Sequence, residues 1–268
     1  MDDKMINNQP IGLIDSGVGG LSILNEVAKQ LPNENLIYIG DNKRAPYGVR
    51  SVDQIKLFTD LMVKALQEYN IKALIIACNT ITAHMLEPLQ ERLAIPVFGV
   101  IDPAARRAVE TSQNKQIGVI GTDSTIASNA YQNELMQLDG EVVVLPLATQ
   151  SFVDLVEENN YHLKESRDFV KETLIGLNET TIDTLILGCT HFPFLKEQIQ
   201  QAFDRPINLV DASTVIPEVL IEEIDASDDS DRTITLLTTG EVGLFTKIAR
   251  DFLDGNDFEV EKIELGEK

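Results

Sequence analysis

The chain has 268 residues, of which 43% are hydrophobic and 24% are charged, as is typical of a folded globular protein. This length allows one large domain or two smaller ones, each with its own core. The net charge of −21 and the isoelectric point of about 4.4 argue against binding to the phosphate backbone of nucleic acids or to anionic membranes. We therefore expect neither a nucleic-acid nor a membrane partner.

The start of the chain is polar. Residues 1–10 lack the basic and apolar parts of a signal peptide. No apolar run approaches the roughly 20 residues that a membrane-spanning helix needs. We therefore expect a cytoplasmic protein whose two cysteines are reduced rather than bridged.

Apolar runs alternate with helical patterns along the chain. The runs predict strands at residues 11–14, 36–39, 74–77, 97–101, 117–120, 142–145, 185–187, 207–210 and 233–238. The helical patterns lie at 22–30, 52–69, 82–93, 124–137, 152–158, 164–177, 194–203, 215–224 and 242–253. The predicted fold class is α/β, with two related lobes, each a parallel-sheet α/β sandwich, and with the active site in the cleft between them.

The two halves of the chain repeat each other. The strand at Ile11 matches the strand at Ile117, an offset of 106 residues, and Leu36 matches Val142 at the same offset. The third and fourth strands repeat at offsets of 111 and 110 residues. Four strands in the same order at a nearly constant offset indicate two related lobes. The alternative is a chance likeness of two unrelated α/β domains, which also gives two lobes.

The last part of the chain is expected to return to the first lobe. The strand at 233–238 and the helix at 242–253 supply this return. We therefore expect a discontinuous lobe of residues 1–101 and 211–268, and a continuous lobe of residues 102–210.

Both cysteines follow the same kind of strand. The segments Ile71–Cys78 and Ile182–Cys189 share their apolar spacing, and small polar residues follow each cysteine. A thiol there lies at the carboxyl edge of a parallel sheet, where open α/β folds bind ligands. Two such thiols can face one small substrate from opposite sides. This arrangement suits a reaction that removes a proton from one face of a carbon and returns one to the other. The alternative is a pair of buried structural cysteines.

Two loops are predicted at the same sheet edge. Loop 15–20 lacks the G-x-G-x-x-G pattern and the lysine of a P-loop, which argues against a dinucleotide site. Its amides, the Asp15 carboxylate and the Ser16 hydroxyl can hold the ammonium and carboxylate of an amino acid. In loop 40–48, Lys43 and Arg44 are expected to be the cations nearest to an acidic substrate, although a plain surface turn is the alternative.

No metal site is expected. The sequence has no C-x-x-C or H-x-x-x-H pair, so His84 and His162 are not expected to join the cysteines as ligands. The acidic stretch 225–231 lacks the glycine and the terminal glutamate of a calcium loop and is interpreted as a solvated loop. His191 follows Cys189 by two residues and can act as its proton partner or tune the thiol, with a capping role as the alternative.

Four motifs together resemble the glutamate racemases of bacterial cell-wall synthesis, in the aspartate/glutamate racemase family. They are GLIDSGVGGLS at 12–22, IGDNKRAPYG at 39–48, ACNT at 77–80 and GCTHFP at 188–193. They cover nearly the whole chain in the right order. The resemblance implies an isomerase that interconverts L- and D-glutamate without a cofactor. It also implies that the D-glutamate enters the peptidoglycan stem peptide.

The resemblance implies roles for individual residues. The two catalytic thiols match Cys78, which serves the D-enantiomer, and Cys189, which serves the L-enantiomer. The family's substrate contacts match Asp15, Ser16, Tyr47, Gly48, Asn79, Thr80, Thr190 and His191. An assisting glutamate of the family falls on Glu157, and we expect Asp41 to assist as well. At Pro103–Ala105 the chain departs from the family, which more often has glycine after the proline of this expected hinge.

The repeat adds one further candidate. Ser16 and Thr122 correspond at the offset of 106 residues, and we expect both hydroxyls to hold parts of the same dicarboxylate. For Thr122 the alternative is a simple cap on the helix that follows.

Three other functions remain open at this point. One is a racemase of another acidic amino acid such as aspartate. The second is a non-catalytic, two-lobed amino-acid-binding protein, and the third is a redox protein that uses the two cysteines as a dithiol. The expected partner is the small-molecule substrate glutamate. No motif specifies the oligomeric state, and we expect a homodimer.

Overall fold

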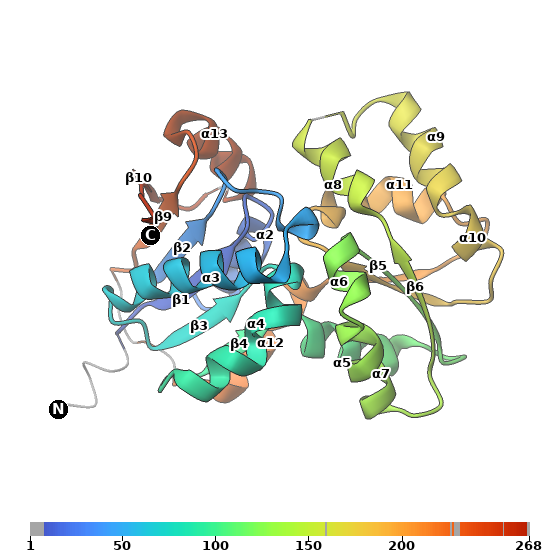
Figure 1. Cartoon of the computed structure of the whole chain (residues 1–268), viewed down its shortest axis with the longest axis horizontal. Helices are drawn as coiled ribbons and strands as arrows, with labels where there is room; N and C mark the ends of the chain where they lie inside the picture. Colours follow the sequence, from blue (N-terminus) through green and yellow to red (C-terminus); the bar gives the residue numbers. More distant parts are fainter. Residues whose placement is uncertain (1–7, 159, 226, 228–230, 254, 267–268) are drawn as a thin grey trace. The chain divides into compact units, whose positions relative to one another are not determined.

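A computed structural model describes residues 8–158, 160–225, 227, 231–253 and 255–266. The chain divides into two compact units. Figure 1 shows the whole chain coloured by position in the sequence. Unit 1 contains the chain up to Val100 and from Ser213 onward, and unit 2 is Ile101–Ala212. No helix among the described residues combines the length and the apolar character needed to cross a membrane.

Unit 1 is built on a six-stranded parallel sheet with the order β10-β9-β2-β1-β3-β4. The strands are β1 (Ile11–Asp15), β2 (Leu36–Gly40), β3 (Ala73–Ile76), β4 (Val97–Gly99), β9 (Ile234–Thr238) and β10 (Glu259–Lys262). The helices are α2 (Leu21–Gln30), η1 (Tyr47–Val49), α3 (Val52–Gln67), α4 (Asn79–Arg92), α12 (Ile216–Glu223) and α13 (Val242–Phe252). Helices α3 and α4 pack together, and α2 packs with α12 and α13, so helices cover the buried central strands (Figure 1).

Unit 2 is built on a four-stranded parallel sheet with the order β6-β5-β7-β8. The strands are β5 (Gln116–Gly121), β6 (Val143–Ala148), β7 (Thr184–Gly188) and β8 (Asn208–Val210). The helices are α5 (Ile101–Thr111), α6 (Asp123–Ala127), α7 (Ala130–Leu138), α8 (Gln150–Glu157), α9 (Lys164–Thr173), α10 (Ile175–Asn178), η2 (Phe192–Leu195) and α11 (Lys196–Gln201). The short helix η3 (Ala212–Thr214) leads back to unit 1. The predicted α/β class with two related parallel-sheet lobes is confirmed.

The strand register refines the internal repeat. The order β2-β1-β3-β4 in unit 1 corresponds to β6-β5-β7-β8 in unit 2. Ile11 pairs with Leu36, whereas Ile117 pairs with Val144, so the equivalent of Leu36 is Val144 and not the expected Val142. A shift of two residues leaves the same side chains on each face of a strand. The apolar pattern therefore could not reveal the shift.

One α-helix and one strand were missed by the sequence pattern. The expected strand at 97–101 ends at Gly99, and Ile101 begins α5, which runs through the expected hinge at Pro103–Ala105. Proline is tolerated there because the first-turn N–H groups of a helix have no partner within the helix. The edge strand β10 was missed because its sequence, Glu-Val-Glu-Lys, is mostly charged, as edge strands often are.

The expected helices at 124–137, 164–177 and 194–203 are each interrupted. The first divides at Asn129, whose φ of 57° is left-handed and ends the helical run between α6 and α7. The second divides at Leu174 into α9 and α10, and the third begins as the one-turn helix η2 before α11. Short helical segments of this kind have the same periodicity as a continuous helix, so the pattern predicted one helix in each case.

A close approach of β5 and β7 requires glycine at 188. A Cβ at Gly188 would lie 2.6 Å from the carbonyl oxygen of Ile120 and 3.0 Å from the ring of Tyr131. We predict that Gly188→Ala lowers the free energy of unfolding by about 1–3 kcal/mol, because neither backbone nor packed ring can give way cheaply.

The matched control is Gly140→Ala, where a Cβ would have no atom of the described chain within 4 Å. That change should stay within about 0.5 kcal/mol of the wild type. Urea unfolding measures both variants, and equal stabilities for the two would show that the approach of β5 and β7 is not tight.

Candidate active site

The carboxyl ends of β1, β2 and β3 bring several predicted site residues of unit 1 to one sheet edge. Cys78 lies two residues beyond the end of β3 and occupies the N-cap position of α4. Its thiol donates to the hydroxyl of Ser16 at 3.6 Å, and the side chains of Asn79 and Thr80 are buried in the first turn of α4. The amides of a helix N-terminus favour negative charge. The thiol of Cys78 therefore lies where a thiolate is stabilised.

The loop after β1 is held by its own polar groups. A carboxylate oxygen of Asp15, which is fully buried, accepts from the amide of Gly17 at 2.9 Å. The hydroxyl of Tyr38 donates to the carbonyl oxygen of Gly17 at 2.8 Å. A Cβ at Gly20 would lie 2.8 Å from Cβ of Asp15 and 2.9 Å from Cβ of Ala77. Glycine at 20 thus lets this loop pack against the residue that precedes Cys78.

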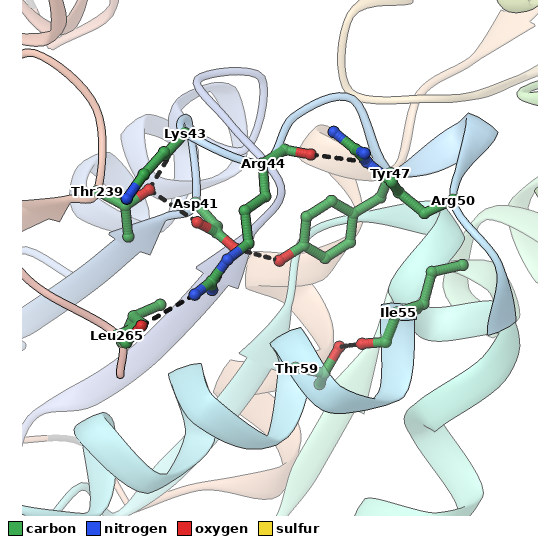
Figure 2. A network of polar contacts seen from close by, with 9 residues as sticks. All are labelled: Asp41, Lys43, Arg44, Tyr47, Arg50, Ile55, Thr59, Thr239 and Leu265. Carbon is green, nitrogen blue, oxygen red and sulfur yellow. Dashed lines mark hydrogen bonds and ion pairs between the residues drawn. The ribbon is translucent and has the colours of Figure 1, made fainter. Parts of the chain in front are cut away.

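The loop after β2 is organised around the buried carboxylate of Asp41 (Figure 2). Asp41 accepts from the hydroxyl of Tyr47 at 2.5 Å, from the hydroxyl of Thr239 at 2.7 Å and from the guanidinium of Arg44 at 3.2 Å. Burial and the charge of Asp41 raise the pKa of Tyr47 far above its usual range. The tyrosine side chain is therefore a neutral donor to Asp41, while Gly48 lies in the one-turn helix η1.

The contacts that Arg44 makes in the structure were not predicted from the sequence. We expected Lys43 and Arg44 to be the cations nearest to an acidic substrate. Instead the buried guanidinium of Arg44 is engaged by Asp41 and by the carbonyl oxygen of Leu265. Lys43 is exposed, and its backbone amide donates to Thr239. The pairing with Asp41 offsets the charge that was expected to act on the substrate.

In unit 2, Cys189 follows β7 and is buried, with a histidine beside it. Nδ1 of His191 lies 3.7 Å from Sγ of Cys189, and Nε2 of His191 lies 2.6 Å from a carboxylate oxygen of Glu157 at the end of α8. Thr190, which separates Cys189 from His191 in the sequence, is also buried. The structure thus brings Glu157, His191 and Cys189 into one chain of polar contacts.

His191 is a charged group in this chain. Burial alone would lower the pKa of His191, but its contacts with Cys189 and Glu157 outweigh burial and raise that pKa to about 10. The hydrogen bond to His191 in turn lowers the pKa of Glu157. An imidazolium donates from both ring nitrogens. At neutral pH His191 therefore has one proton for Glu157 and one directed at the sulfur of Cys189.

Thr122 takes the capping position at the start of α6. Its hydroxyl accepts from the amide of Thr125 at 3.2 Å and lies 2.9 Å from the hydroxyl of Thr125. The capping alternative for Thr122 is therefore present in the structure, and its contact with substrate stays a prediction. Ser16 differs, because its hydroxyl accepts from the thiol of Cys78.

Two residues that support the site were missed by sequence reasoning. Tyr38 is the only residue of β2 with a polar side-chain group, and that pattern could have indicated its bond to Gly17. Thr239 gave no signal, because it reaches Asp41 from a segment 198 residues away.

The described residues contain no group of three or more histidine, cysteine, aspartate or glutamate side chains arranged to hold a metal ion. Both cysteines are free thiols. Residues 226 and 228–230 of the acidic stretch lie outside the described residues, so its interpretation as a solvated loop stays a prediction.

Known proteins resemble the chain over almost its whole length. A profile of the Asp/Glu/Hydantoin racemase family matches residues 11–217. A glutamate racemase of Latilactobacillus sakei is 40% identical, with 97% of this chain and 96% of that protein covered. The crystal structure of a glutamate racemase isoform from Bacillus anthracis has a TM-score of 0.92 at 38% identity and covers 97% of this chain and 98% of its own.

A second solved structure includes a ligand. The glutamate racemase of Francisella tularensis, crystallised in complex with D-glutamate, has a TM-score of 0.89 at 33% identity and covers 97% of this chain and 98% of its own. Sequence and structure thus agree with the resemblance that the four motifs indicate. The chain belongs to the Asp/Glu/Hydantoin racemase family and, within it, to the glutamate racemases, which are isomerases.

Proposed function

We propose that the protein interconverts L- and D-glutamate by a two-base mechanism in which Cys78 and Cys189 are the bases. One observation carries this proposal: each thiol follows the equivalent strand of its unit, β3 or β7, and each has a polar partner of its own. The complex of the Francisella tularensis relative with D-glutamate supports the same substrate here. The proposed reaction needs no cofactor, because two thiols can supply and remove the proton.

In the proposed reaction from L-glutamate, the thiolate of Cys189 removes the α-proton and the thiol of Cys78 donates its proton to the opposite face. The C–H bond to one face breaks and a C–H bond to the other face forms. The enzyme is left with a protonated Cys189 and a thiolate at Cys78. That state is the one that converts D-glutamate in the reverse direction, and proton exchange with water restores the first state.

The surroundings of the two thiols suit these states. The imidazolium of His191 lies beside Cys189 and stabilises a thiolate there, while the N-terminus of α4 stabilises a thiolate at Cys78. The α-proton of an amino acid is a far weaker acid than a thiol. The reaction therefore also requires stabilisation of the negative charge that develops on the substrate.

We propose that main-chain amides supply much of this stabilisation. The first amides of a helix have no partner within that helix and readily bind carboxylates. In unit 1 such amides lie at the start of α4, at Asn79 and Thr80. The amides of Tyr47 and Gly48, which match substrate contacts of the family, lie in the three-residue helix η1. The hydroxyl of Tyr47 is engaged by Asp41, so its contact with substrate would come from the backbone.

The remaining proposed contacts come from side chains and from unit 2. We propose that the carboxylate of Asp15 and the hydroxyl of Ser16 bind the substrate's ammonium. Thr190 and Thr122 would contact a carboxylate. The supply of D-glutamate for peptidoglycan is the proposed role of the product, and the homodimer stays a prediction.

The two thiols can be tested one at a time. Cys78→Ser and Cys189→Ser should each lower kcat for racemisation at least about a hundredfold in both directions, because a hydroxyl is too weak a base at neutral pH. Serine is close to cysteine in size, so the melting temperature should hardly change. Polarimetry from each pure enantiomer gives the rates. Full activity in either variant would rule out a mechanism that uses both thiols.

The contact between Glu157 and His191 predicts a pH dependence. The pKa of His191 in the folded protein lies above its ordinary value of 6.5, so the stability from this group is complete below pH 6.5 and is lost as pH rises toward about 10. Glu157→Gln removes one of the two contacts that raise this pKa, so the pKa of His191 should fall, and the loss of stability should be smaller and should be complete at a lower pH.

A histidine NMR titration measures the effect directly. The matched control is Glu158→Gln, because Glu158 bonds to Asn160 instead of to the histidine. It should leave the pKa of His191 unchanged. The same His191 pKa in both variants would contradict the assignment of Glu157 as the partner of His191.

A further inference from the structure

The buried carboxylate of Asp41 depends on donors that come from distant parts of unit 1. Tyr47 and Arg44 donate to one of its oxygens, and Thr239 donates to the other (Figure 2). A carboxylate that is fully buried needs an opposite charge beside it. Arg44 provides that charge, and the backbone amide of Arg44 also donates to the carbonyl oxygen of Asp41.

The guanidinium of Arg44 is in turn held on two other sides. Its second terminal nitrogen donates to the carbonyl oxygen of Leu265 at 2.9 Å, and its central carbon lies 4.6 Å from the centroid of the Phe58 ring. The planar fork of arginine suits this task, because it directs separate donors at a carboxylate and a carbonyl at the same time. Arg44 thus connects Asp41 to the segment around Leu265, beyond β10.

The carbonyl of Leu265 is itself fixed in place. Strand β10 pairs with β9, and beyond it the amide of Ile263 donates to the carbonyl oxygen of Thr238. The side chain of Leu265 is 8% exposed and belongs to the same hydrophobic cluster as Tyr47. The C-terminal segment therefore presents its carbonyl to Arg44 from a packed position.

We infer that Arg44 is a positioning residue for substrate binding: through Asp41 it fixes Tyr47 and Gly48, and the carbonyl of Leu265 fixes Arg44. This inference rests on the proposed function, in which the amides of Tyr47 and Gly48 bind glutamate. Arg44 acts without contacting substrate, because its guanidinium is directed at Asp41 and Leu265. The C-terminal segment is thereby part of the support of the substrate loop.

The test is a comparison of KM with kcat. Arg44→Met keeps an unbranched apolar side chain but removes the charge and the hydrogen bonds to Asp41 and Leu265. It should raise KM for L- and D-glutamate by about tenfold each and change kcat by less than about threefold, because a misplaced binding loop weakens ground-state and transition-state binding alike. Arg44→Lys keeps the charge but cannot reach Asp41 and Leu265 together. It should raise KM by an intermediate factor.

The matched control is Arg205→Met. Arg205 also lies over a phenylalanine ring and donates to main-chain carbonyls, those of Asn178, Thr180 and Ile182, but it belongs to unit 2, whereas Asp41 belongs to unit 1. The Arg205→Met variant should have a lower melting temperature and an unchanged KM for glutamate. A lowered melting temperature with unchanged KM in Arg44→Met would overturn the inference. If Arg44→Met does not fold, Arg44→Lys decides, and an unchanged KM there overturns it equally.

Failure of the inference can be told apart from failure of the proposed function. Wild-type enzyme and the two cysteine variants are assayed in the same series. Loss of racemisation in both cysteine variants together with wild-type KM in the Arg44 variants would remove only the inference. Full racemisation in a cysteine variant would remove the proposed mechanism, whatever KM the Arg44 variants have.

Discussion

The parallel pairing of β1 with β3, and of β5 with β7, is the constraint on which both halves of the candidate site depend. Ile14 pairs with Ile76, so the residues that follow, Asp15 and Ala77, lie side by side at the carboxyl edge of the sheet. Gly121 pairs with Gly188 in the same way, which brings Thr122 beside Cys189. Parallel strands that end together deliver their loops to one edge, and glycines at the close approaches keep that edge compact.

The repeated frame holds two different environments. In unit 1 the thiol of Cys78 lies at the start of a long helix, with the hydroxyl of Ser16 as its neighbour. In unit 2 a turn and the one-turn helix η2 follow Cys189, and the imidazolium of His191 with Glu157 behind it takes the place of a long helix. In the proposed reaction each thiol takes its turn as the base, and each unit places a different group beside that thiol, a helix N-terminus in unit 1 and an imidazolium in unit 2.

How far the sequence could predict this depends on the range of each interaction. Local apolar runs, which the packing of parallel sheets requires, predicted most of the strands and the positions of both thiols. The four sequence motifs indicated the family. Helix α5 was missed because Pro103 looked like a boundary, and β10 because its residues are charged. The contact between Arg44 and Leu265 was not predicted because the two residues lie 221 positions apart in the chain, and no local pattern encodes such a contact.

The central claim, that two thiols act on opposite faces of one carbon, is tested most directly by isotope exchange. The protein is incubated with L-glutamate in deuterated water, without added cofactor and with a metal chelator, and both enantiomers are analysed early in the reaction. The account predicts that the new D-glutamate has deuterium at the α-carbon while the remaining L-glutamate keeps its proton. Early deuterium in both enantiomers, which a single exchanging base gives, or no racemisation at all, would contradict it.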